Sequence, residues 1–206
     1  MGTTIPANRP AIGWRAWVLG DDGRLLSVHD SSVHGRWTRP GGMAATCMPS
    51  RRTPQMPEPH TSPDKTCHCG LRAMNLEPLL YALVDQPELI GTRPDRWTDP
   101  GRWADLDELE WRTRNNVLYM PDVIGTCEMW GRFEAGRWFD PDGTYRFQYG
   151  RVGKTLHLGA HVASWAKAVK HWHRGARVHV GRSLGAAWLD EIATVERLPS
   201  HTGATP

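Results

Sequence analysis

The first ordered pattern in the chain is an alternation between two sets of side chains. In GWRAWVLGDDGRLLSV, Trp14, Ala16 and Val18 form one set and alternate with Arg15, Trp17 and Leu19. The cluster Gly-Asp-Asp-Gly at 20–23 then interrupts the apolar run. Alternation with period two, followed by turn-forming residues, is typical of a β-hairpin. We therefore predict strands over residues 13–28 and a disordered lead-in at residues 1–12.

A second strand-like region begins near residue 117. VLYMPDVIGTCEMWGRFEAGRWF is rich in β-branched and aromatic residues, the turn DPDG follows at 140–143, and TYRFQYGRV continues the pattern. The sheet is therefore expected to form from segments near 13–28 and 117–156.

Other segments have apolar residues at helical spacing. Residues 76–90 and 103–112 are predicted helices within an acidic insertion at 77–116. Two more are predicted in a basic helical region at 157–198, joined by the strand-like RVHVG, before a frayed tail at 199–206.

These elements predict an α+β fold in a chain of 206 residues. The expected architecture is a small antiparallel sheet or partly open barrel, a zinc-clamped Pro-rich loop and peripheral helices, with residues 13–156 as the main domain. The sequence has no apolar run of membrane-spanning length, and its N-terminus lacks the charged-then-apolar order of a signal peptide. We expect a cytoplasmic protein without a membrane partner.

Two thiols separated by one residue, in TCHCGL, suggest a metal site. They follow a stretch from Pro40 to Pro63 with six prolines, which fix φ and remove backbone donors, so that this long loop needs an anchor. Cysteine thiolates and an imidazole suit structural Zn²⁺, whose four bonds would supply that anchor. The predicted ligands, in the pattern C-x12-H-x6-C-x-C, are Cys47, His60, Cys67 and Cys69.

The metal site has alternatives. The cysteines could be buried free thiols or a redox or nucleophilic pair, although C-x-C differs from the C-x-x-C of thioredoxin-like proteins. His68 could replace His60, although a residue between two ligands usually points away from the metal. Cys127, in the apolar stretch VIGTCEMWG, is predicted to be a core residue.

Charge is distributed unevenly along the chain. Residues 143–189 contain eight Lys or Arg and five His but no Asp or Glu, whereas residues 77–122 contain ten acids and five arginines. A basic segment of this kind favours an acidic partner, and nucleic-acid phosphates are the leading one. The candidate contacts are Arg151, Lys154, Lys167, Lys170, Arg174, Arg177 and Arg182.

Other catalytic or phosphate-binding motifs are weak. YGRVGKT at 149–155 has Gln148 where the first glycine of a phosphate-binding loop should stand. His171 and His173 are two residues apart, so that on a helix they face different sides, and no carboxylate is near them in sequence.

The favoured function is therefore a non-catalytic, zinc-stabilised module that binds nucleic acid. The alternative is an accessory or regulatory factor that holds a partner protein through its acidic insertion and exposed tryptophans.

Several short motifs follow one another in order over about residues 13–75 and 117–156. They are Trp14-Arg15-Ala16-Trp17, Leu25-Leu26-Ser27, Trp37 with Pro40, Cys47, His60 with Pro63, CHCGLRA, VIGTCEMWG and YRFQYGRV. In this order the chain resembles a family of small uncharacterised proteins of actinobacteria and their phages, in which an alanine stands at the position of Gly150. The resemblance implies a zinc-bearing, mainly β domain, located in the host cytoplasm if phage-encoded, and implies no activity.

Overall fold

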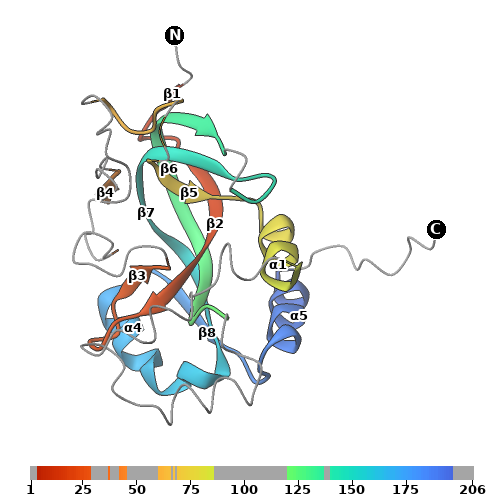
Figure 1. Cartoon of the computed structure of the whole chain (residues 1–206). Helices are drawn as coiled ribbons and strands as arrows, with labels where there is room; N and C mark the ends of the chain where they lie inside the picture. The colour runs from red at the N-terminus through yellow and green to blue at the C-terminus, as the bar shows by residue number, and fades with distance from the viewer. Residues whose placement is uncertain are drawn as a thin grey trace, which may run out of the picture.

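The fold is α+β, as predicted. The computed structural model describes residues 4–28, 37, 42–45, 60–65, 67, 69–85, 120–136 and 140–196. Within these residues, eight strands form one mixed sheet that does not close, and three α-helices pack outside it (Figure 1).

Two long antiparallel strands form the centre of the sheet. They are β6 (Val123–Ala135) and β7 (Tyr145–Leu158), and their ladder is interrupted by two register shifts. Along the outer edge of β6 lie β2 (Ala11–Leu19) and the short β1 (Thr4–Ile5), and β3 (Leu25–Ser27) pairs with β2. The predicted hairpin over residues 13–28 is thus formed by β2 and β3.

The other edge of β7 carries three short strands. β5 (Leu71–Ala73) and β4 (Met43–Ala44) pair with it in antiparallel fashion, and β8 (Arg177–Val180) pairs in parallel. A single bridge between Trp14 and Met74 joins β2 to the residue after β5, which curls the sheet without closing it.

Helices flank this sheet at two places. α1 (Leu76–Asp85) and α5 (Ala186–Val195) follow each other along one side, whereas the 3₁₀ helix η3 (Ala160–Trp165) and α4 (Ala166–Trp172) lie near β3 and β8 (Figure 1). Alternate residues of β2 face two hydrophobic cores. Ala16 and Val18 pack with α1 and α5, whereas Trp17 and Leu19 pack with β6, β7 and α4.

Three expectations require correction. The sheet is mixed rather than antiparallel, because β8 is reached from β7 through η3 and α4, and a helical crossover returns the chain in the parallel direction. The lead-in at 1–12 is not disordered over residues 4–12, where β1 and the start of β2 pair with β6. In the region 157–198, the strand-like RVHVG forms β8 between the helices, as predicted, but the first two residues belong to the end of β7 rather than to a helical region.

The start of the acidic insertion also differs from expectation. Residues 77–85 belong to α1, which is not a peripheral appendage: Leu79 and Leu83 are each 1 % exposed and pack against Ala16, Val18 and Trp188. The rest of the insertion, including the predicted helix at 103–112, lies outside the described residues, as do the tail at 199–206 and most of the Pro-rich loop. None of the helices in the described ranges has the length and apolar character needed to cross a membrane.

Candidate metal centre

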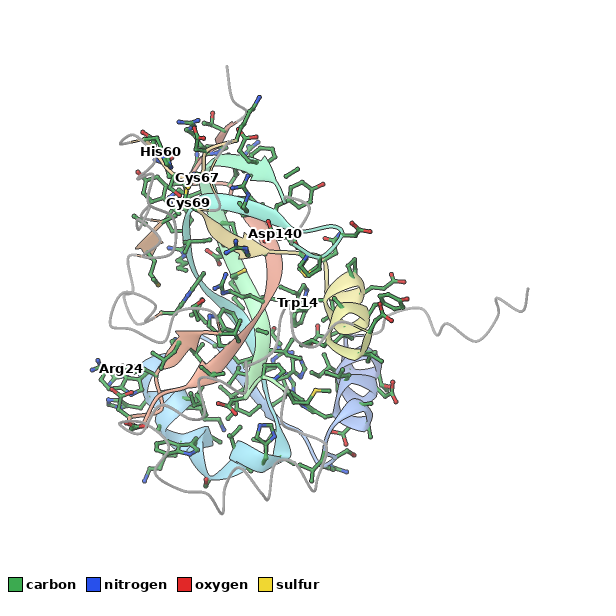
Figure 2. The ribbon with its side chains drawn as sticks, viewed as in Figure 1. Trp14, Arg24, His60, Cys67, Cys69 and Asp140 are labelled. Carbon is green, nitrogen blue, oxygen red and sulfur yellow. The ribbon has the colours of Figure 1, made fainter. Side chains whose placement is uncertain are left out.

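Three of the four predicted metal ligands lie together just before β5. The ligand atoms of His60, Cys67 and Cys69 are all within 4.8 Å of one another, and each side chain is half-buried. Figure 2 shows the three side chains grouped at one end of the sheet. This arrangement could hold a metal ion.

The distance between two of these atoms fits metal coordination. His60 Nε2 lies 3.3 Å from Cys69 Sγ. In a tetrahedral zinc site with Zn–N about 2.0 Å and Zn–S about 2.3 Å, nitrogen and sulfur are roughly 3.5 Å apart. Cys67 and Cys69 are both thiols rather than partners in a disulfide. The same 3.3 Å also fits a hydrogen bond between the thiol and the imidazole, so that the distance alone does not identify an ion.

A buried arginine fastens the backbone of this loop to the sheet. Arg146 of β7 is only 1 % exposed. Its Nη1 donates to the carbonyl oxygens of Asp64 (3.2 Å), Cys67 and Cys69 (3.1 Å), and its Nε donates to Ala135 of β6 (3.3 Å). The planar guanidinium thereby satisfies carbonyls from two separate parts of the chain. Because the two cysteine carbonyls share one donor, both thiol-bearing residues are held in register with β7.

Gly70 allows the chain to turn from the cysteines into β5. Its φ is +127°, a conformation that side-chain-bearing residues rarely adopt. A Cβ at this position would lie 2.8 Å from Cβ of Arg146 and 3.2 Å from Cβ of Pro63. The glycine after C-x-C is therefore required by both backbone conformation and space. Once the turn is made, Arg72 of β5 forms an ion pair with buried Asp140 (2.5 Å), which fixes the strand that leaves the loop.

The remaining metal predictions concern residues outside the described ranges. Cys47, the fourth predicted ligand, and His68, the alternative to His60, both lie there. Cys127 is a core residue, as predicted: it is fully buried, and burial raises the pKa of its thiol to about 12. A thiol with this pKa stays protonated at neutral pH and is a poor metal ligand or nucleophile.

The seven predicted nucleic-acid contacts are all exposed, but they are not equivalent. Arg151 forms an ion pair with Glu128 on the neighbouring strand β6 (2.5 Å), so that its charge is partly compensated. The backbone N–H of Arg182 donates to Glu191. Within the described ranges, no carboxylate pairs with the other five side chains, which are Lys154, Lys167, Lys170, Arg174 and Arg177. Arg146, also in the acid-free segment, is buried at the loop and unavailable to a partner.

The YGRVGKT stretch at 149–155 lies inside β7, which rules out a phosphate-binding loop followed by a helix.

Two histidine–carboxylate pairs, one buried and one partly buried, were not predicted. His161 Nε2 lies 3.1 Å from Oδ1 of Asp122, whose Oδ2 accepts from the Leu19 N–H, and both side chains are nearly inaccessible. His157 Nε2 lies 2.8 Å from Oε1 of Glu196. Burial lowers the pKa of His157, and Glu196 partly opposes this. The partners in each pair are 39 residues apart, so that no local motif could have revealed them.

The chain was compared with protein-family models, with characterised proteins and with solved structures, and none of them matches it.

Proposed function

We propose that this protein is a non-catalytic binding module stabilised by Zn²⁺ and that it contacts nucleic acid through exposed basic residues of its C-terminal third. The zinc would be held by His60, Cys67 and Cys69, with Cys47 as the fourth ligand. Two thiolates and an imidazole form a donor set that suits Zn²⁺ better than Mg²⁺ or Ca²⁺, which prefer oxygen ligands.

Distance between the two sites supports a structural role for the metal. His60, Cys67 and Cys69 lie at one end of the sheet, whereas α4 and β8 lie towards the opposite end (Figures 1 and 2). An ion at the first place does not reach a ligand bound at the second. Its proposed contribution is to order the loop, since metal binding and loop ordering share one free energy.

The observation that carries the nucleic-acid proposal is the group of exposed cations on α4 and β8. Lys167 and Lys170 are exposed on one face of α4, three residues apart, and Arg177 is exposed on β8. They belong to the acid-free segment 143–189, although Asp22 of the turn after β2 lies beside Trp172 at the same end of the molecule. Lys and Arg at such a surface neutralise phosphates and release counterions, which gives affinity with little dependence on sequence.

Salt dependence of binding tests this proposal. The triple variant Lys167→Gln, Lys170→Gln, Arg177→Gln removes three of the proposed phosphate contacts. The matched control Arg9→Gln, Lys65→Gln, Arg132→Gln removes the same net charge elsewhere. The logarithm of the affinity for duplex DNA falls with the logarithm of salt concentration by about 0.9 per phosphate contacted. The first variant should therefore flatten this slope by about two to three units, and the control should leave it nearly unchanged.

Two results would contradict the proposal. One is negligible binding of the unaltered protein to both duplex and single strands at low salt. The other is an equal change of slope in both triple variants, which would reduce the effect to net charge. Capture of the same partner protein from a lysate with and without nuclease would then favour the alternative of a protein-binding factor.

A further inference from the structure

A groove of about 700 Å³ runs between β7 and the turn that follows α4. Its lining includes three basic side chains, Arg151 and Lys154 from β7 and Arg174 from the turn, and one carboxylate, Glu128, which is paired with Arg151. We call it the α4 groove. Its volume is in the range of small-molecule sites, and its excess of positive charge favours an anion.

Two buried nitrogen atoms in residues lining the α4 groove have no hydrogen-bond partner within the part of the chain that the structure describes. Trp37 is 2 % exposed and its Nε1 is unpaired, and His173 is 9 % exposed and its Nε2 is unpaired. Buried polar atoms are nearly always satisfied, because leaving one without a partner costs free energy. Burial also lowers the pKa of His173 to about 4, so that its imidazole is neutral at pH 7. Both nitrogens are almost inaccessible in the unliganded protein and have no partner among the described residues, so that a ligand in the groove would reach them only if the groups that cover them shift.

An aromatic ring at the same groove is held in a fixed position. Trp172 lines the groove, and its Nε1–H donates to the carbonyl of Asp22 (2.9 Å). The guanidinium of Arg24 lies 4.0 Å from the centre of the Trp172 ring, and Figure 2 shows Arg24 beside α4. Because the guanidinium covers one face of this indole, a planar ligand would stack on the other face, and the fixed ring would lose little side-chain entropy in doing so.

We infer that the α4 groove binds a nucleoside monophosphate unit, either as a free nucleotide or as one nucleotide of a single strand. Lys154 and Arg174 bind its phosphate, Trp172 contacts its base, and Trp37 and His173 supply hydrogen bonds to its polar edge. A phosphate alone would leave the indole and the two buried nitrogens without a role. A neutral nucleoside would leave the basic side chains without one. The inference rests on the proposed function in that both place a phosphate ligand at this basic end of the molecule.

Calorimetric titration with adenosine monophosphate, adenosine, inorganic phosphate and a 12-nucleotide single strand tests the inference. We expect the monophosphate to bind at least tenfold more tightly than adenosine or inorganic phosphate. The double variant Lys154→Gln, Arg174→Gln should weaken monophosphate binding tenfold or more. The control Arg9→Gln, Lys65→Gln, which removes equal charge from exposed residues outside the groove, should change it less than twofold.

A second variant separates ligand binding from folding. His173→Phe replaces an unpaired buried nitrogen by carbon at similar volume, so that the protein should stay folded with unchanged or increased thermal stability. Its affinity for the monophosphate should nevertheless fall about threefold or more. Wild-type affinity in a stable His173→Phe variant would overturn the assignment of this residue.

The titrations with the different ligands also distinguish a failure of this inference from a failure of the proposed function. Binding of the strand without binding of the monophosphate would overturn the groove inference and leave the basic surface as the nucleic-acid contact. Binding of the monophosphate alone would support the groove as a free-nucleotide site and contradict the proposed function. Equal losses of affinity for the monophosphate in the groove variant and in its charge-matched control would overturn the groove site.

Discussion

Arg146 donates a hydrogen bond from Nη1 to the carbonyl oxygen of Cys69 at 3.1 Å, across 77 residues of sequence. The same nitrogen donates to the carbonyl of Cys67. The loop that carries the candidate metal ligands is therefore fixed by a side chain of the central strand β7 as well as by any ion. This predicts that the loop and the sheet depend on each other for stability.

Replacement of Arg146 by Met should lower the free energy of unfolding by about 3 kcal/mol or more. The variant removes the donors to four carbonyl groups, and each buried polar group left unsatisfied costs about 1–3 kcal/mol. Arg151→Met on the same strand is the matched control, because Arg151 is exposed and its pairing with Glu128 contributes at most about 1 kcal/mol. Urea unfolding of both variants measures the difference. Equal losses would mean that the hydrogen bonds to the loop carry little free energy.

Gly70 provides a second, independent probe of the loop. Gly70→Ala places a Cβ 2.8 Å from Arg146 in a strained conformation and should cost about 2 kcal/mol or more. Gly175→Ala is the control, since a Cβ there meets nothing within 4 Å among the described residues and the backbone is unstrained. Its effect should stay within about 0.5 kcal/mol. Thermal unfolding of the two variants tests the comparison, and similar melting temperatures would refute the steric account of Gly70.

The place of α1 in the core leads to a third prediction. Leu83→Ala should cost about 2–5 kcal/mol because Leu83 is 1 % exposed and its truncation leaves a cavity against β2 and α5. Val84→Ala, one residue further along the same helix, should be nearly neutral because Val84 is 60 % exposed. The free energies of unfolding in urea provide the test. A small loss of unfolding free energy in Leu83→Ala would show that α1 is a peripheral helix rather than part of the core.

His173 should make stability depend on pH. Its folded-state pKa is about 4 and its ordinary value is 6.5, so that between these pH values the unfolded chain binds more protons than the folded chain. The contribution of this residue to the free energy of unfolding is therefore constant above about pH 6.5 and falls as the pH drops towards 4. Below pH 4 the protein is up to about 3 kcal/mol less stable than at pH 7 because of this residue. His173→Phe should gain stability relative to the wild type over this range. Parallel pH profiles for the two proteins would show that His173 titrates normally.

Local patterns in the sequence predicted much of the fold. Alternation over residues 13–19 predicted β2, and the helical spacing of apolar residues in the region 157–198 predicted a helix that the structure forms as α5. These features depend on neighbours within a few residues. The parallel pairing of β8 was missed because pairing direction depends on how α4 packs, which RVHV does not encode by itself. The acids near α1 suggested a solvated appendage, although its buried face is set by the leucines.

The candidate metal site likewise combines features that depend on residues close in sequence with features that depend on distant ones. His60, Cys67 and Cys69 were predicted from their spacing, and the structure brings them together because they lie within ten residues of one another. Arg146 was counted among the basic residues of an acid-free segment, and its role in the loop was not predicted. Its contacts with Cys67 and Cys69 span more than 70 residues. The α4 groove likewise joins Trp37, β7 and the turn after α4, which are distant in sequence.

The metal content of the purified protein is the most direct test of the central claim. Protein prepared without chelators should contain about one equivalent of zinc by elemental analysis. Cys69→Ser should lose the zinc and several kcal/mol of stability, whereas Cys127→Ala, at the buried thiol away from the loop, should keep the zinc. Absence of zinc and of any other transition metal from the unaltered protein would contradict the account.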